Sequence, residues 1–238
     1  MLVYNLSLKK EVLNYEFLNI KFEIILIIYT KIHIRMIKMD KNIVFKIGYG
    51  LYMLSAQDKG KNNGCIINTV MQVTDVPLRI AVTVNKKSLT GKMVSLTQKM
   101  NISILSQSVP FSTFEIFGFK SGEEIDKFSK VTFKKSKNGL CYLDKNVVGY
   151  MSCEVQDEID LGTHKMFICN LIDSEILSNE EPLTYAYYHT NIKPKPKKEN
   201  KTGWRCIICG YIYEGENLPS DFICPWCKHG AVDFERIQ

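Results

Sequence analysis

Cys206-Ile-Ile-Cys209 and Cys224-Pro-Trp-Cys227 decide the fold at the C-terminal end of this chain. The two Cys-x-x-Cys pairs are separated by 14 residues, a spacing typical of four thiolates around one tetrahedral metal ion. A segment this short cannot build a large hydrophobic core, so the metal is expected to supply free energy of folding. The pattern therefore predicts a small metal-binding domain over residues 203–238, with these four cysteines as ligands.

The identity of the metal is not settled by the spacing, because tetrahedral sulfur sites hold zinc or iron alike. The surrounding residues favour iron, since aromatic side chains exclude water and lower the dielectric constant around a redox centre. Apolar residues between the cysteines, such as Ile207 and Trp226, suit a docking surface for a redox partner better than a nucleic-acid contact. The aromatic residues of the segment are Trp204, Tyr211, Tyr213, Phe222, Trp226 and Phe234.

The same segment resembles rubredoxin, and its short gap resembles the rubredoxin-type domain of rubrerythrins. The resemblance is carried by Trp204-Arg-Cys-Ile-Ile-Cys-Gly-Tyr-Ile-Tyr-Glu-Gly215, by Asp221-Phe-Ile-Cys-Pro-Trp-Cys227 and by Asp233-Phe234. It implies one iron ion that cycles between the ferric and ferrous states. Lys228 departs from the pattern, because many rubredoxins have glycine after the last cysteine.

The body of the chain, residues 39–190, is predicted to be mainly β. Its strand candidates are rich in β-branched residues or alternate polar with apolar residues, and a single helix is expected over residues 89–100. This composition favours a barrel or sandwich over a doubly wound sheet, and neither a dinucleotide-binding glycine fingerprint nor a P-loop is present. The expected strands are residues 79–85, 101–106, 147–158 and 165–176 and a short last strand over residues 185–188.

Residues 191–202 form a linker with alternating Pro and Lys, which carries five lysines and one glutamate. Such a segment buries no apolar surface and is expected to be an extended tether. The net charge of +6 is concentrated in this tether and in the first 39 residues, which argues against a nucleic-acid-binding face on the body.

Residues 1–38 show no pattern typical of a folded domain and are expected to be a loosely attached or untranslated leader. In one interpretation, translation starts at Met39. No apolar run approaches the roughly 20 residues of a membrane span, so no membrane association is predicted. The scattered cysteines are expected to be buried, reduced thiols, which is typical of the cytoplasm. They are Cys65, Cys141, Cys153 and Cys169.

Two polar segments of the body are candidates for ligand binding. Lys87-Ser-Leu-Thr90 follows a predicted strand and opens the predicted helix, where free N–H groups and the helix dipole favour an anion. Plain N-capping by Ser88 or Thr90 is the simpler alternative. Asn68-Thr-Val-Met-Gln72 could hydrogen-bond a heterocycle or merely satisfy buried backbone.

The body resembles the flavin reductase family of flavoredoxin type, whose fold is an FMN-binding split β-barrel. The carrying motifs are Asn68-Thr69 with Gln72, Pro77 to Val82, Ser88 to Thr90 with Asn101 to Ser106, Phe117 to Gly122, Gly162 to Ile168 and Thr184 to His189. The resemblance implies an FMN near a homodimer interface, reduced by NAD(P)H.

Site residues follow from that resemblance. Asn68, Thr69 and Gln72 would contact the isoalloxazine or ribityl part, and Lys87, Ser88 and Thr90 would hold the phosphate. His164 would lie beside the flavin where the nicotinamide docks, although a structural strand histidine is an equal alternative. Thr163 stands where the family's signature has aspartate.

A flavin reductase body joined to a rubredoxin domain resembles the high-molecular-weight rubredoxin family. It implies a cytoplasmic NAD(P)H:flavin/rubredoxin oxidoreductase that feeds a flavodiiron oxygen or nitric oxide reductase under oxidative or nitrosative stress. A flavin is needed between NAD(P)H and the iron, because NAD(P)H yields two electrons together and one iron ion accepts a single electron. The alternatives are a free-flavin reductase with a structural zinc ribbon and a non-enzymatic zinc-ribbon adaptor.

Overall fold

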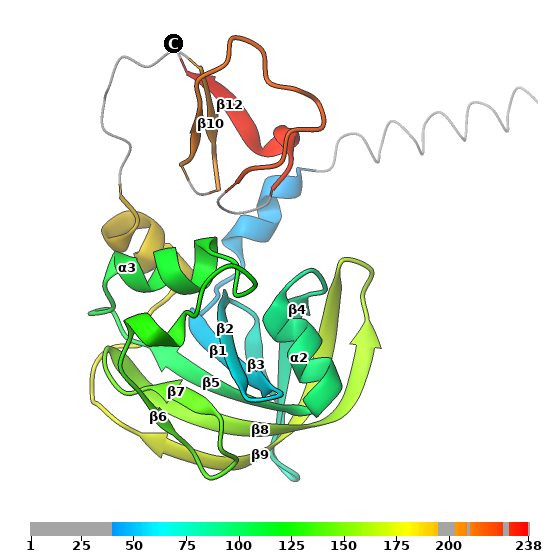
Figure 1. The fold of residues 1–238 in the computed structure, drawn as a ribbon, viewed down its shortest axis with the longest axis vertical. Coiled ribbons are helices and arrows are strands. Elements are labelled where there is room, and N and C mark those ends of the chain that lie inside the picture. Colours follow the sequence, from blue (N-terminus) through cyan, green and yellow to red (C-terminus); the bar gives the residue numbers. More distant parts are fainter. Residues whose placement is uncertain (1–39, 195–202, 209, 226–228, 238) are drawn as a thin grey trace, which may run out of the picture. The chain divides into compact units, whose positions relative to one another are not determined.

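The computed structural model describes residues 40–194, 203–208, 210–225 and 229–237 (Figure 1). The chain divides into two compact units, residues 1–47 and residues 48–238. The described part of the first unit carries one short 3-10 helix, η1 (Lys41–Lys46). The predicted leader and residues 195–202 of the predicted tether lie outside the described residues.

Residues 48–194 are built around one antiparallel sheet of seven strands in the order β2-β1-β5-β8-β9-β4-β3 (Figure 1). The sheet leaves β2 and β3 as its two edge strands, and the long strands β8 and β9 curve beneath the others. The prediction of a mainly β body is confirmed. The strands are β1 (Tyr52–Asp58), β2 (Lys61–Ile67), β3 (Val70–Thr74), β4 (Arg79–Asn85), β5 (Lys99–Leu105), β8 (Val147–Asp160) and β9 (His164–Ile176).

Alternation of side chains along these strands gives the barrel its main core. In the β8–β9 pair Val155 opposes Cys169, and in the β4–β9 pair Val82 opposes Phe167, so that all four side chains share the inner face. Helix α2 (Leu89–Thr97) packs on this face through Met93 and Val94. The core comprises Leu54, Ala56, Ile67, Ile80, Val82, Val84, Met93, Val94, Met100, Ile102, Cys153, Val155, Phe167 and Cys169.

Helix α2 ends earlier than the predicted residue 100. Gln98 adopts a left-handed conformation with φ of 57° and its backbone N–H donates to Val94 O, which ends the helix. Lys99 then begins β5, because Met100 and Ile102 alternate into the core. Ser88 is the N-cap, one of the two residues for which plain capping is the simpler alternative to anion binding.

A second apolar cluster is covered by short elements. Its buried members include Leu105, Phe114, Phe117, Phe128, Leu183 and Tyr188. The covering elements are α3 (Phe111–Phe114), the π-helix η2 (Glu115–Phe119), the 3-10 helix η3 (Phe128–Lys130), and the hairpin β6 (Phe133–Lys135) and β7 (Cys141–Leu143). None of the helices in the described ranges is long and apolar enough to cross a membrane.

The prediction of a last short strand over residues 185–188 is wrong. This segment forms helix α4 (Tyr185–Tyr187) followed by the π-helix η4 (Tyr188–Ile192). The Thr184 side chain accepts a hydrogen bond from Tyr187 N, which starts the helix. Tyr188 then packs on Phe114 with ring centroids 4.4 Å apart, so tertiary packing outweighs the β propensity of the tyrosines.

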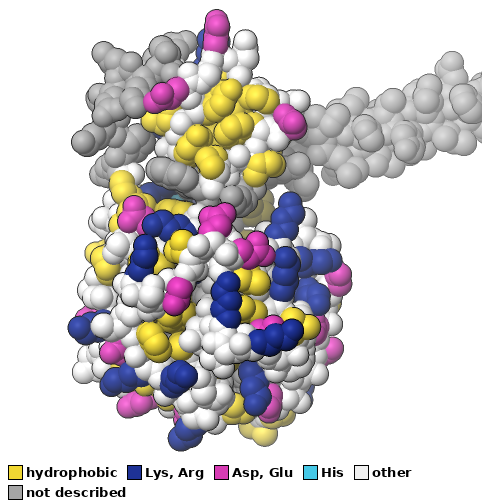
Figure 2. Space-filling view, in the orientation of Figure 1, with side chains coloured by type: hydrophobic (Ala, Val, Ile, Leu, Met, Phe, Trp, Pro, Cys, Tyr) yellow, Lys and Arg dark blue, Asp and Glu magenta, His cyan; other side chains and the backbone are white. Residues whose placement is uncertain are grey.

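The C-terminal domain contains a sheet of three strands in the order β11-β10-β12. Its elements are β10 (Gly203–Cys206), β11 (Ile212–Tyr213), the 3-10 helix η5 (Ala231–Asp233) and β12 (Phe234–Ile237). Hydrophobic side chains gather on the viewed face of this domain (Figure 2), and its exposed apolar residues include Ile207, Ile223 and Val232. On the barrel, basic and acidic side chains are interspersed on the viewed face.

Candidate functional site

Two of the four predicted metal ligands lie in the described residues, and both are fully buried. Cys206 ends β10, and Cys224 lies between an isolated bridge residue, Ile223, and a turn. Cys209 and Cys227 lie outside the described residues, as do Trp226 and Lys228. The four-cysteine ligand set therefore stays a prediction, which the burial of Cys206 and Cys224 supports.

Backbone hydrogen bonds join each described cysteine to residues that follow it in the chain. Cys206 N donates to Tyr211 O at 2.8 Å, and Gly210 N donates back to Cys206 O at 2.8 Å. Cys224 N donates to His229 O at 2.7 Å, beside the bridge between Ile223 and Gly230. Gly210 has a φ of 82°, a left-handed conformation that glycine adopts without steric cost.

Aromatic rings enclose these thiols. Cys206, Cys224 and Phe234 form one buried cluster, and Phe222 packs on Phe234 and Tyr213 with ring centroids 5.3 Å and 4.8 Å apart. Soft sulfur donors in a dry aromatic shell fit iron or zinc by ligand chemistry, and the low dielectric constant suits a redox ion. The residues present therefore fit the ion that the domain requires.

The candidate phosphate residues lie at the start of α2. Ser88 Oγ accepts from Gly91 N at 3.4 Å, and Thr90 is fully buried and accepts from Asn63 Nδ2 at 3.1 Å. The first turn of α2 contains no acidic residue, so nothing there opposes a bound anion. Lys87 is exposed, and its backbone N–H donates to Asn85 Oδ1 at 2.9 Å.

The first turn of α2 packs closely against strand β4. A Cβ added at Gly91 would lie 3.0 Å from Val84 Cγ1 and 3.2 Å from Asn85 O, so glycine allows α2 to approach β4. Asn63 was missed by the sequence reasoning, because its contact with Thr90 joins positions 27 residues apart. No local motif marks such a contact.

The candidate isoalloxazine residues lie on β3 and on the connection from β2 to β3. Asn68 and Thr69 form the connection from β2 to β3, with Thr69 Oγ1 donating to Asn68 Oδ1 at 3.0 Å. Thr83 N donates to Thr69 O at 3.1 Å, which ties the connection to β4. Gln72 lies on β3 and is exposed. These polar groups can hydrogen-bond a flavin, and their roles stay predictions.

His164 begins β9 and is brought close to the same region. It pairs with Asn85 across the β4–β9 ladder, and Lys86 N donates to Thr163 O at 3.1 Å. The His164 Nδ1 atom lies 2.9 Å from Thr163 Oγ1, so the residue that replaces the expected aspartate contacts the imidazole directly. The structure thus places His164 beside the loop that leads into α2, and its proposed role stays a prediction.

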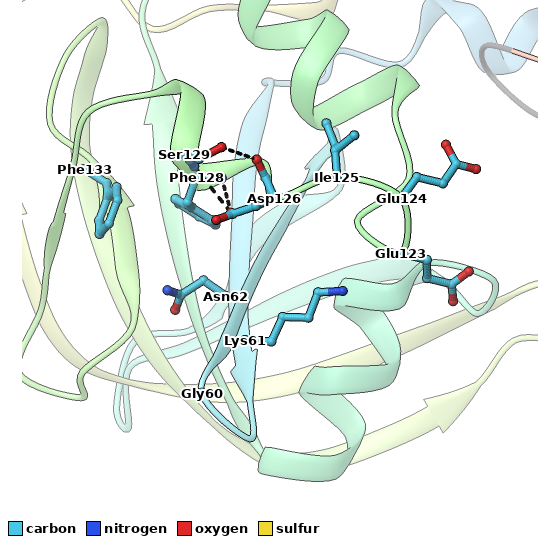
Figure 3. Close-up of a pocket in the computed structure, with 10 residues that line it drawn as sticks. All are labelled: Gly60, Lys61, Asn62, Glu123, Glu124, Ile125, Asp126, Phe128, Ser129 and Phe133. Carbon is cyan, nitrogen blue, oxygen red and sulfur yellow. Dashed lines mark hydrogen bonds between the residues drawn. The ribbon is translucent and has the colours of Figure 1, made fainter.

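A separate pocket of about 600 Å³ lies between the β1–β2 turn and residues 123–129 (Figure 3). Lys61, Glu123 and Glu124 border it, and Asp126 Oδ1 accepts from Phe128 N at 3.0 Å on its wall. None of the predicted flavin residues lines this pocket, so it is distinct from the α2 site.

Comparison with known proteins identifies both parts of the chain. Residues 44–194 match the family described as "Flavin reductase like domain", and residues 204–235 match "Rubrerythrin, rubredoxin-like domain". A high molecular weight rubredoxin of Moorella thermoacetica is 36% identical over 84% of this chain and 100% of its own length. A ferric-chelate reductase (NAD(P)H) of Archaeoglobus fulgidus is 36% identical over 66% of this chain and 93% of its own.

The fold of the barrel is also found in solved structures. The flavoredoxin of Methanosarcina acetivorans superposes with a TM-score of 0.51 at 21% identity and covers 61% of this chain and 79% of its own. The flavin reductase family implies an oxidoreductase with a flavin, and the rubredoxin-like domain implies iron and electron transfer. The chain therefore belongs to the high-molecular-weight rubredoxin family, in which a flavin reductase-like domain is fused to a rubredoxin-like domain.

Proposed function

We propose that this protein is a cytoplasmic NAD(P)H:flavin/rubredoxin oxidoreductase that carries FMN in the barrel and one iron in the C-terminal domain. The observation that carries the proposal is the presence of both domains on one chain. A bound flavin would supply the chemistry that divides the electron pair of NAD(P)H into single electrons for the iron. The chain's own residues bind and orient that flavin and keep water from the iron.

The proposal assigns the phosphate to Lys87, Ser88 and Thr90, and the ring and ribityl chain to Asn68, Thr69 and Gln72. His164 would border the position where the nicotinamide docks. The absence of acidic residues from the first turn of α2 supports the phosphate assignment. Cys206, Cys209, Cys224 and Cys227 would hold the iron, and the buried position of the described pair supports this.

Self-association as a homodimer is part of the proposal. Met71 on β3 opposes Ala81, which in turn opposes Ile168 on β9, so these three residues share the outer face of the sheet, and Ile172 follows on β9 at a register shift. Met71 is 54% exposed and Ile172 is 49% exposed. An apolar sheet face beside the exposed edge strand β3 is the kind of surface that a second copy covers.

An anaerobic ultraviolet–visible titration of the purified protein with NADH and with NADPH tests the relay. We expect flavin and ferric-thiolate bands that both bleach, the iron band by reduction from within the chain. If flavin bleaches and metal-replete protein never develops an iron band, the domain is a structural zinc ribbon and the protein is a free-flavin reductase. A protein with neither band contradicts the enzyme and leaves a zinc-ribbon adaptor.

The substitution Cys206→Ser tests whether electrons pass through the iron to an acceptor protein. This variant should retain NAD(P)H:flavin turnover, because the barrel is unchanged, and should lose electron delivery to a flavodiiron oxygen or nitric oxide reductase. Cys153→Ala, which changes a buried thiol of the barrel core, is the matched control and should still deliver electrons. Unchanged delivery by Cys206→Ser would contradict a relay through the iron.

A further inference from the structure

Lys127 is a buried lysine whose side chain reaches the edge strand β2 and the π-helix η2. It is 4% exposed, and its Nζ donates to Gly64 O at 2.9 Å and to Phe117 O at 3.3 Å. Its neighbours Asp126 and Phe128 line the pocket of Figure 3, whereas Lys127 does not. The ammonium group is therefore directed away from that pocket, toward the edge of β2.

The Lys127 charge has no anionic partner in the described part of the chain. Both acceptors of its hydrogen bonds are uncharged carbonyl oxygens, and no described carboxylate lies within ion-pair distance. Lysine is almost never fully buried without a counter-charge, because desolvation strongly disfavours the ammonium ion. Covering the edge strand β2 accounts for the hydrogen bond to Gly64 O, and joining β2 to the π-helix η2 accounts for the one to Phe117 O, but a neutral donor would serve both purposes as well.

The residues around Lys127 connect it to the start of α2. Gly64 lies between Asn63 and Cys65 on β2, and Asn63 is the donor to Thr90. A Cβ added at Gly122 would lie 2.0 Å from Asn63 Oδ1, so the segment that leads to Lys127 packs directly on Asn63. Thr90, one of the candidate phosphate residues, and the ammonium group of Lys127 thus contact adjacent residues of β2, Asn63 and Gly64.

Cys65 does not act as the missing anion. Burial raises the pKa of its thiol, although hydrogen bonds with Ser88 and Thr90 and the charge of Lys127 oppose that rise. Burial in turn lowers the pKa of Lys127. A neutral thiol leaves the charge of Lys127 without a counter-ion among the described residues, which an external anion would supply.

We infer that Lys127 is the electrostatic determinant of the phosphate site and makes the barrel select FMN over riboflavin. This rests on the proposed flavin site at Ser88 and Thr90. Lys127 acts through a low-dielectric interior, where solvent and salt screen a charge poorly. Lys87 is exposed, so its contribution to phosphate binding is the smaller of the two.

Binding of FMN and of riboflavin to the iron-loaded, flavin-stripped full chain tests the inference. Lys127→Gln keeps a hydrogen-bond donor but removes the charge, and it should weaken FMN binding about 10-fold or more, the loss of one charged interaction. Riboflavin, which lacks the phosphate, should bind within about twofold of the wild type. Lys127→Arg should retain the preference for FMN. Lys92→Gln, an exposed change on α2, is the control and should alter neither affinity.

Equal losses of FMN and riboflavin affinity in Lys127→Gln would mean that Lys127 acts only through the fold, and would overturn the inference. An unchanged FMN affinity, or a greater loss in Lys87→Gln, would do the same. If the wild type binds neither FMN nor riboflavin, that result contradicts the proposed function and therefore also this inference, which rests on it.

A measurement on the wild type decides the question even if Lys127→Gln does not fold. The ratio of FMN to riboflavin affinity should change less than about twofold between roughly 0.05 and 0.5 M salt, because a buried charge is screened little. A ratio that collapses with salt would assign the phosphate to exposed lysines and overturn the inference.

Discussion

The turn after Cys206 depends on a single residue, Gly210. Its φ of 82° costs an L-residue about 1–2 kcal/mol, and its N–H closes the turn on Cys206 O. Gly210→Ala should therefore speed iron loss to a chelator severalfold, measured as decay of the ferric-thiolate band.

A matched glycine in the barrel provides the control for Gly210→Ala. Gly139 has a φ of 83°, with open space around its missing Cβ. Gly139→Ala introduces the same backbone strain into the β6–β7 turn and should lower the melting temperature of the barrel without changing iron release. Equal iron release in both glycine variants would show that the cysteine turn does not need the left-handed conformation.

At the scale of elements, Glu158 holds three of them together. It lies on β8 and accepts from Lys165 Nζ at 2.7 Å on β9, from Ser95 Oγ at 3.1 Å on α2, and from Gln98 Nε2 at 3.0 Å. The hydrogen bond from Lys165, followed by those from Gln98 and Ser95, holds the pKa of Glu158 below its usual value. Ionised Glu158 therefore stabilises the docking of α2 on the sheet.

Glu158→Gln should lower the melting temperature at pH 7 by about 2–4 °C, from a loss near 1 kcal/mol after discounting for partial exposure. Because the folded pKa lies below the unfolded one, this contribution is complete above about pH 4.3 and is lost as the pH falls through the folded pKa. The difference between variant and wild type should accordingly vanish in acid.

Asp160→Asn is the control for Glu158→Gln. Asp160 forms an ion pair with Lys86 on the surface, at 2.7 Å and with a 60% exposed side chain. Its removal should change the melting temperature little at any pH, because solvent screens exposed pairs. A loss in Asp160→Asn as large as that in Glu158→Gln would contradict the special role of Glu158.

At the scale of the whole molecule, the outer sheet face predicts the oligomeric state. Ile172→Lys places a charge at a half-exposed apolar position of β9 and should convert the proposed dimer to a monomer in sedimentation velocity runs. Leu96→Lys, a substitution at a 73% exposed position on α2, should leave the dimer intact. A wild-type protein that sediments as a monomer contradicts the proposed homodimer.

The predicted tether would hold the two proposed redox sites on one chain and so raise their effective concentration for each other. A short linker gives an effective concentration of the order of millimolar, so electron transfer to the iron should not depend on protein concentration in the intact chain. Cleavage at a protease site inserted within residues 195–202 should slow iron reduction and make its rate proportional to concentration. Stopped-flow absorbance measures both, and an unchanged rate after cleavage contradicts the tether's role.

Local patterns were enough to predict much of this protein. Cysteine spacing, aromatic content, β-branched runs and the N-cap at Ser88 each depend on neighbours within a few residues, so the small metal domain, the mainly β body and α2 follow from the sequence. The helical segment after Thr184 does not, because contact between Tyr188 and the distant Phe114 decides it.

The surroundings of the candidate flavin site came only from tertiary structure. Asn63 reaches Thr90, and Lys127 reaches Gly64, across 27 and 63 positions of the chain. In sequence Lys127 is one lysine among many, and its burial without a carboxylate partner in the described part of the chain appears only when β2, the start of α2 and residues 121–127 are folded together. Ligand types and strand periodicity are local properties, so the amino-acid sequence alone predicts the kind of chemistry that the chain carries. The tertiary structure decides which charged side chains lie near the candidate flavin site, because burial and electrostatic pairing depend on residues far apart in the chain.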